Sequence, residues 1–139
     1  MAAVSLLCDT GPLVAFFNRS DQYHAWASAQ FDHIFDPLLT CEAVVSETVF
    51  LLQDDGLPVE PVFEAIERGK LKVTFAANEH WSDIRRLIAK YQDLPMSLAD
   101  ACLVRMAELR QQCQVFTTDR DFRIYRRHGR QSIPLLAPF

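Results

Sequence analysis

Short apolar runs alternate with longer stretches of helical spacing, and this alternation constrains the fold more than any other feature of the chain. A bilayer-spanning helix needs about 20 apolar residues, whereas these runs have only the length of buried strands. Strands separated by helices predict parallel pairing with crossover helices. The predicted fold is therefore α/β, a three-layer sandwich with a short, mostly parallel central sheet flanked by helices. The predicted strands are Val4–Cys8, Asp36–Thr40, Leu71–Phe75, Val115–Thr118 and Ile133–Leu135.

The helices between these strands are placed by their capping residues. Pro12 suits the first turn of a helix that begins near Gly11. Side chains of the types that cap helix N-termini stand before other apolar-periodic stretches, namely Asp21, Thr40, Asn78 and Ser97. The predicted helices cover residues 11–18, 21–35, 41–53, 58–68, 79–91, 98–111 and 122–127.

Composition predicts one compact domain over residues 1–139, with half of its residues hydrophobic and a mean hydropathy of zero. The first residues, MAAVSLLCD, lack the basic start and long apolar segment of a secretory signal. The four cysteines form no CxxC pair, which favours buried free thiols in a reducing cytoplasm over disulfides or zinc. We therefore expect a cytoplasmic protein without a membrane anchor.

Two acidic residues directly follow predicted strands. Asp9 comes after LLC and Asp119 comes after VFTT. Ligands of open α/β sheets bind beyond the carboxyl ends of the strands, so these acids suggest a site at that edge. Each also has a purely structural interpretation as the N-cap of the helix that follows it.

Two further acids interrupt helical apolar faces. Glu47 lies three residues after Val44 and four before Leu51, and Asp100 precedes Leu103 and Val104 at the same kind of spacing. Glu47 is predicted to lie on the apolar stripe of its helix and Asp100 on a buried face or at its edge, whereas Glu42 and Glu108 are predicted to be solvated. Buried carboxylates need compensation from arginines or from a cation. Oxygen-only ligands favour Mg²⁺ or Mn²⁺ over zinc.

The chain resembles PIN-domain ribonucleases, most closely the VapC-type toxins of prokaryotic toxin–antitoxin pairs. Four stretches carry the resemblance, occur in family order and cover essentially the whole chain: LLCDTGPLVAFFNRSD, TCEAVVSETVFLL, MSLADACLVRMAE and VFTTDRDF. The resemblance implies a catalytic quartet of acids, of which Asp9, Asp100 and Asp119 hold the metal. The quartet is Asp9, Glu47, Asp100 and Asp119.

The resemblance also implies supporting residues around the quartet. Hydroxyls would orient the acids or a water molecule, and Asp121 matches a frequent extra acid of the TxDxDF segment. Gly11 departs from the Ser or Asn often found after DT, so one polar contact is expected to be missing. The supporting set is Thr10, Thr118, Asp121 and Ser97.

The implied activity is hydrolysis of RNA phosphodiester bonds with one or two divalent ions. A net charge of −4 does not indicate a nucleic-acid binder, but five arginines fall within residues 120–130. A solvated surface explains this cluster as well as a phosphate site does, and Arg120 and Arg123 are the predicted phosphate contacts. The resemblance further implies a homodimer and a cognate antitoxin protein as partners.

Four alternatives remain open at this stage. LLCDTG resembles the DTG turn of aspartic proteases, but those proteins are β-rich and this chain is predicted to be largely helical. A phosphatase with a nucleophilic Asp9 would usually carry DxDxT, whereas the chain has DTGPL. A PIN nuclease with a housekeeping role and a catalytically silent RNA- or protein-binding PIN module would both have a similar sequence.

Overall fold

A computed structural model describes residues 3–139, and a five-stranded parallel sheet forms its centre. The strand order is β3-β2-β1-β4-β7, and every neighbouring pair is parallel. β1 is central, with Leu7 opposite Leu39 on one side and Val115 on the other. The predicted α/β sandwich is confirmed. The strands are β1 Ser5–Cys8, β2 Leu38–Thr40, β3 Leu71–Val73, β4 Cys113–Phe116 and β7 Leu135–Leu136.

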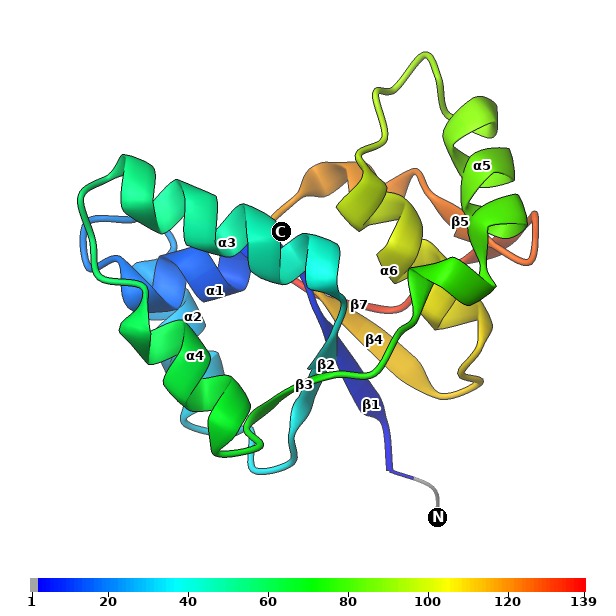
Figure 1. The fold of residues 1–139 in the computed structure, drawn as a ribbon. Helices are drawn as coiled ribbons and strands as arrows, with labels where there is room; N and C mark the ends of the chain where they lie inside the picture. The colour runs from blue at the N-terminus through cyan, green and yellow to red at the C-terminus, as the bar shows by residue number, and fades with distance from the viewer. Residues whose placement is uncertain (1–2) are drawn as a thin grey trace.

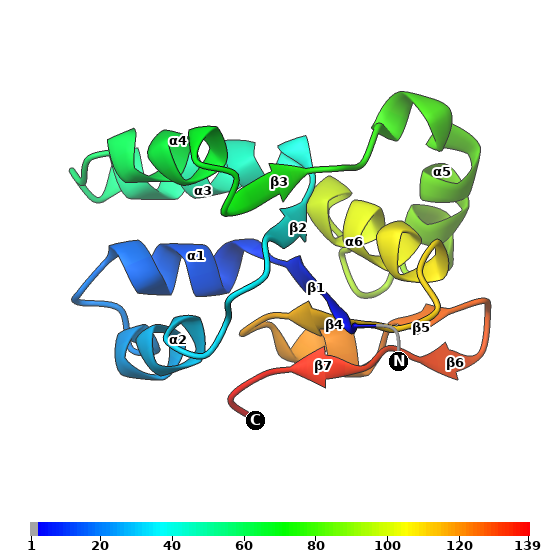
Figure 2. The same ribbon diagram turned by 90° about the horizontal axis from the view of Figure 1, so that it is seen from below.

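Helices cover both sides of this sheet. In both views, α1, α2, α3 and α4 lie on one side of the strands, and α5 and α6 lie on the other (Figures 1 and 2). The helix α6 is almost wholly buried, because it packs against β1, β4 and α5 at once. The helices are α1 Thr10–Phe17, α2 His24–Phe31, α3 Glu42–Asp54, α4 Glu60–Glu67, α5 Trp81–Lys90 and α6 Leu98–Glu108, with short 3₁₀ turns η1 Ala77–Glu79 and η2 Arg120–Arg123.

Three of the four predicted helix caps are wrong. The Thr40 hydroxyl donates to the Cys8 carbonyl oxygen at 2.8 Å, so it ties β2 to β1 and does not cap α3. Asn78 lies inside η1 and accepts from the Trp81 indole. Asp21 accepts from the Tyr23 backbone, and α2 begins only at His24. Local contacts satisfy Asp21 and Asn78, and a contact with the neighbouring strand satisfies Thr40, so none of the three side chains caps the helix predicted for it.

The fourth cap, Ser97, is confirmed. Its hydroxyl accepts from the Asp100 N–H at 3.0 Å, while the Asp100 carboxylate accepts from the Ser97 N–H at 3.3 Å. This reciprocal pair is a capping box, which satisfies two of the free N–H groups at the start of α6. The same pair fixes the orientation of the Asp100 side chain.

The predicted helix over residues 122–127 is wrong beyond Arg123. A hairpin replaces it, in which β5 Arg126–Arg127 pairs antiparallel with β6 Gln131–Ser132. Its turn places His128 and Gly129 at φ 53° and 82°, which only a few residue types adopt readily. The two arginines therefore belong to a strand whose side chains point to opposite faces, and Arg127 is buried while Arg126 is not.

The prediction of buried free thiols is confirmed, since all four cysteines are free and buried.

The prediction that Glu108 is solvated is wrong. Its side chain is only 5% exposed, because it pairs with Arg105 at 3.1 Å and accepts from the His128 backbone. None of the helices in residues 3–139 combines the length and the apolar character that crossing a bilayer requires.

Candidate metal centre

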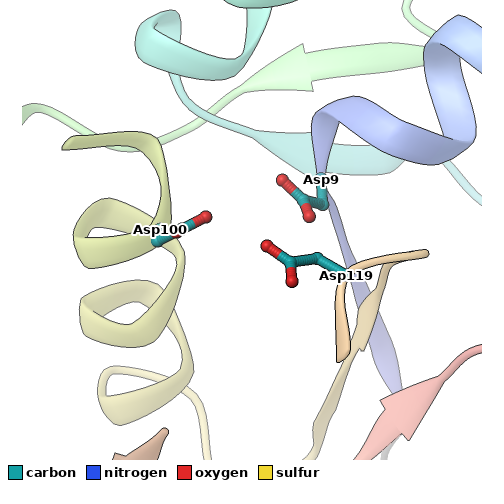
Figure 3. A group of neighbouring side chains, drawn as sticks. All are labelled: Asp9, Asp100 and Asp119. Atoms are coloured by element: carbon teal, nitrogen blue, oxygen red, sulfur yellow. The ribbon is translucent and has the colours of Figure 1, made fainter. Parts of the chain in front are cut away.

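Three aspartates meet at the carboxyl edge of the sheet. Asp9 directly follows β1 and caps α1, Asp119 follows β4 and caps η2, and Asp100 lies in the first turn of α6. β1 and β4 are parallel neighbours, so their carboxyl ends emerge side by side, and α6 brings the third acid to them. The three carboxylates point toward one another (Figure 3). One oxygen from each lies within 4.8 Å of the others.

Asp9 is the most buried of the three and is held at both oxygens. Its Oδ1 accepts from the Thr10 N–H at 2.8 Å, and its Oδ2 accepts from the Thr117 hydroxyl at 2.7 Å. The capping role considered from the sequence is therefore real. It accounts for one carboxylate oxygen and leaves the gathering of three acids unexplained.

Thr117 is the residue that sequence reasoning missed. Its hydroxyl donates to Asp9 and accepts from the Asp119 N–H at 2.9 Å, so one fully buried side chain connects two of the acids. Strand alternation could have found it, since Thr117 shares a sheet face with the buried Val115.

Within residues 3–139 the Thr118 hydroxyl makes no hydrogen bond to the acids, so its supporting role stays a prediction. The Thr118 hydroxyl packs against Gly11, where a Cβ would clash with it. Gly11 therefore makes room for a neighbouring hydroxyl at the edge of the cleft. The space that a side chain at position 11 would fill is occupied by the Thr118 hydroxyl, which lines the same cleft.

Asp100 uses one oxygen for structure. Its Oδ2 accepts from the Ser97 N–H in the capping box and from the Tyr125 hydroxyl at 3.1 Å. Tyr125 is fully buried and reaches Asp100 from the segment between η2 and β5. The other carboxylate oxygen, Oδ1, has no hydrogen bond within residues 3–139. Ser97 and Tyr125 thus position Asp100 without occupying both of its oxygens.

The electrostatics of the cluster are those of crowded like charges. Burial, followed by repulsion from Asp100 and Asp119, raises the pKa of Asp9 to about 7, against lowering by its hydrogen bonds with Thr117 and Thr10. Burial and the charge of Asp119 also raise the pKa of Asp100. Across the described chain, no Lys, Arg or His nitrogen lies within 4.0 Å of these three carboxylates. Arginine compensation is therefore excluded by the geometry.

Glu47 is close to the cluster but not part of it. It lines the same cleft, yet it is exposed and lies outside the group of three. The prediction that it sits on the apolar stripe of its helix is wrong, because α3 buries Val44, Thr48 and Leu52 and leaves Glu47 at the rim. Partial burial and the charge of Asp100 still raise its pKa.

Asp121 likewise stands beside the cluster. Its backbone N–H donates to Asp119 Oδ1 at 2.9 Å, and its carboxylate is not among the converging oxygens. Asp121 therefore orients Asp119 through its backbone, and the charge of Asp119 contributes to the raised pKa of Asp121 after burial.

The residues present fit a hard divalent cation. The cleft has a volume of about 540 Å³ and brings together carboxylate oxygens and hydroxyls, the donors that Mg²⁺ and Mn²⁺ prefer. The Thr10 hydroxyl oxygen is buried at its wall and has no hydrogen-bond partner in residues 3–139. Buried polar atoms are rarely left unpaired. An ion, with water in its coordination sphere, would satisfy the acids and this hydroxyl together.

Comparisons with known proteins agree with the geometry. A family model described as PIN domain matches residues 6–127, a range that holds all three aspartates. Ribonuclease VapC26 of Mycobacterium tuberculosis is 27% identical over 117 residues, which is 83% of this chain and 87% of that protein. The crystal structure of M. tuberculosis VapC20, a sarcin-ricin loop cleaving toxin, has the same fold with a TM-score of 0.70. It is 19% identical and covers 84% of this chain and 92% of its own.

Proposed function

The chain belongs to the PIN-domain family, and on that premise we propose that it is a divalent-metal-dependent endoribonuclease that acts as the toxin of a toxin–antitoxin pair. The proposal treats residues 1–139 as one nuclease domain. The likeness to proteins named as a ribonuclease and as an RNA-cleaving toxin supports the activity and the toxin role.

One observation carries the proposal. Three carboxylates converge within 4.8 Å, and within residues 3–139 no guanidinium lies close enough to compensate them. A protein that needed only capped helices would not gather three like charges, because each raises the cost of ionising the others. A bound cation removes that cost, and a phosphodiester is the substrate whose hydrolysis such a cation assists.

The three converging aspartates and Glu47 each have a proposed part in the reaction. When bound, a divalent ion supplies Lewis acidity to the phosphate and makes water a stronger nucleophile. Asp9, Asp100 and Asp119 would hold that ion, each offering one of the converging oxygens. Glu47 at the rim would orient the attacking water or accept its proton, and burial and the charge of Asp100 raise its pKa in the direction that makes it a stronger base.

The proposed partners follow from the same premise. An antitoxin protein is proposed because both named relatives are of the VapC type. A homodimer is proposed because the exposed side chains of Phe50, Phe63 and Val73 line one groove on α3, α4 and β3. Exposed apolar grooves of this kind often mark protein interfaces. An RNA substrate also implies a cytoplasmic site of action.

The test is cleavage of end-labelled cellular RNA by the purified chain with Mg²⁺ or Mn²⁺. We expect cleavage products with either ion and none after addition of EDTA. Asp100→Asn should lower the rate by about 10³-fold or more, because several kcal/mol of transition-state stabilisation depend on the ion.

Asp36→Asn is the matched control for this test. Asp36 is an exposed acid before β2, at the opposite edge of the parallel sheet, so the same charge change should leave the rate unaltered. Cleavage that persists in EDTA, or an Asp100→Asn variant that cuts RNA at the parent rate, would contradict the proposal.

A further inference from the structure

The arginine cluster of residues 120–130 divides into two groups with different surroundings. Arg126 donates through Nη1 to three carbonyl oxygens of its own turn, those of Arg123, Ile124 and Tyr125, at 2.8 to 3.2 Å. Arg127 is buried and donates to the carbonyl oxygens of Ala107 and Arg110. The fold therefore holds Arg127 in the interior and ties one nitrogen of Arg126, Nη1, to the backbone of its own turn.

Arg120 and Arg123 make a different contact. Their guanidinium carbons lie 5.1 and 5.7 Å from the centroid of a single ring, that of Phe139. These distances are within the range of about 6 Å over which a cation interacts with an aromatic face. Both arginines are exposed, and within residues 3–139 neither has a carboxylate within 4.0 Å. Two like charges therefore share one apolar support without an anion between them.

This arrangement stands at the edge of the acidic cleft. Arg120 follows Asp119 directly and lines the same cleft, and Arg123 ends the same 3₁₀ turn. A flexible guanidinium beside three carboxylates would ordinarily pair with one of them. Contact with Phe139 holds both groups away from the acids. The carboxylates stay available for a cation, and the guanidiniums stay available for an anion.

We propose that Arg120 and Arg123, held in place by Phe139, form a binding subsite for an RNA backbone phosphate next to the bond that is cleaved. The inference rests on the proposed function and adds residues to it. Arginine binds phosphate through a planar fork of N–H donors, and such backbone contacts fix the register of a nucleic acid without reading its bases. Phe139 is a positioning residue, because it acts through the two arginines.

RNA binding, measured apart from cleavage, tests the subsite. All variants are made in the Asp9→Asn background with EDTA, and fluorescence anisotropy follows a labelled RNA oligonucleotide at several KCl concentrations. The double variant Arg120→Gln with Arg123→Gln should bind about tenfold more weakly. Its plot of log K against log salt should be shallower by about 1.4, since each contact to a single strand contributes about 0.7. The double variant must keep the parent fold for this comparison, which circular dichroism checks.

Arg130→Gln is the matched control. It removes one positive charge, half of the charge removed by the double variant, from an exposed arginine, and the β5–β6 hairpin that carries it projects away from the end of the chain marked C (Figure 2). Its affinity and its salt slope should stay close to those of the parent. If Arg130→Gln and the double variant lost equal affinity for RNA, net charge alone would explain the loss. That result would overturn the subsite.

Phe139→Leu separates positioning from general stability. With both arginines present, loss of the ring should weaken RNA binding. In the Arg120→Gln, Arg123→Gln background it should have no further effect, because interacting residues are not additive. Equal losses in both backgrounds would overturn the positioning role.

The failure of this inference differs from the failure of the proposed function. A parent chain that binds and cleaves RNA while the double variant binds equally well overturns the subsite alone. A parent chain that neither binds nor cleaves RNA overturns the proposed function and the subsite with it.

Discussion

A charged side chain is buried at each end of α6, and the two charges have opposite surroundings. At the carboxyl-terminal end, Arg127 donates to the carbonyl oxygens of Ala107, Arg110 and Gln111 and contacts the Cys113 sulfur. A cation there also suits the negative end of the helix dipole. At the amino-terminal end, Asp100 faces two more carboxylates.

The two ends of α6 therefore differ in role, because the Arg127 end belongs to the fold and the Asp100 end belongs to the site. At the Arg127 end the buried charge is paired with backbone carbonyl groups, and only the guanidinium Nε is left without a hydrogen-bond partner within residues 3–139. The Asp100 end satisfies one oxygen by capping and then adds repulsion from Asp9 and Asp119. A buried charge with partners stabilises a fold, whereas a cluster of like charges costs stability until something binds.

The largest expected consequence is a stability of the metal-free protein that falls as pH rises. The pKa of Asp9 is raised to about 7 in the folded state, whereas an unfolded aspartate ionises near pH 4. Between these values the folded state binds the extra proton, so the free energy of unfolding decreases from about pH 4 to about pH 7. At about 1.4 kcal/mol per pKa unit the loss approaches about 4 kcal/mol as an upper limit.

Urea denaturation in EDTA between pH 5 and pH 8 measures this slope. Saturating Mn²⁺ should restore stability at the upper end of the range, because an ion bound to ionised carboxylates removes their repulsion. Asp9→Asn, which carries no titrating group at position 9, should flatten much of the slope. A metal-free protein whose stability rises with pH would contradict the prediction.

A smaller loss is expected at the other end of the helix. Arg127→Met keeps the length of the side chain but removes every donor, leaving buried carbonyl oxygens unpaired. Unfolding should become easier by about 3 kcal/mol. The increment that Mn²⁺ adds to stability should not change, since the acids at the far end of the helix keep their contacts.

Arg126→Met is the control for this prediction. Its hydrogen bonds lie largely at the surface, where water replaces a lost donor, so its loss should be well under half as large. If the two variants lost equal stability, burial of the Arg127 guanidinium would not be the cause.

The contrast between the two ends also explains what the sequence could predict. Asp9 and Asp119 can be predicted as site residues because each follows an apolar run, and parallel strands bring such positions to one edge of the sheet. Asp100 is readable because it interrupts a helical apolar face and falls three residues after a serine cap. These signals are local, so the parallel sheet and the edge at which the acids lie follow from the pattern, whereas the strand order β3-β2-β1-β4-β7 was not predicted.

The remaining features depend on contacts between distant segments. Tyr125 reaches Asp100 from 25 residues away, and nothing in IYRR marks it. Arg127 was indistinguishable from its neighbour Arg126 until a hairpin placed the two on opposite faces. Glu47 shows the limit of helical periodicity, which gives the direction of a side chain but not where the packed face ends.

Thr117 offers the finest test of how the acidic end is built, because the sequence pointed to its neighbour Thr118. Thr117→Val keeps the shape of the side chain but removes the 2.7 Å bond to Asp9 and the acceptor for the Asp119 N–H. Groups that orient metal ligands typically contribute 10- to 100-fold to affinity, so Mn²⁺ affinity, measured by titration calorimetry, should fall by about that factor.

Thr118→Val is the matched control, since that hydroxyl packs against Gly11 and has no bond to the acids. Its Mn²⁺ affinity should stay near the parent value, and Thr117→Ser should recover most of what Thr117→Val loses, because serine restores the donor. Weaker binding in Thr118→Val than in Thr117→Val would return the role to Thr118. It would also mean that the Thr117 hydrogen bonds stabilise the end of the strand without shaping the site. Thr117 would then be a structural residue, as Arg127 is, and not part of the metal centre.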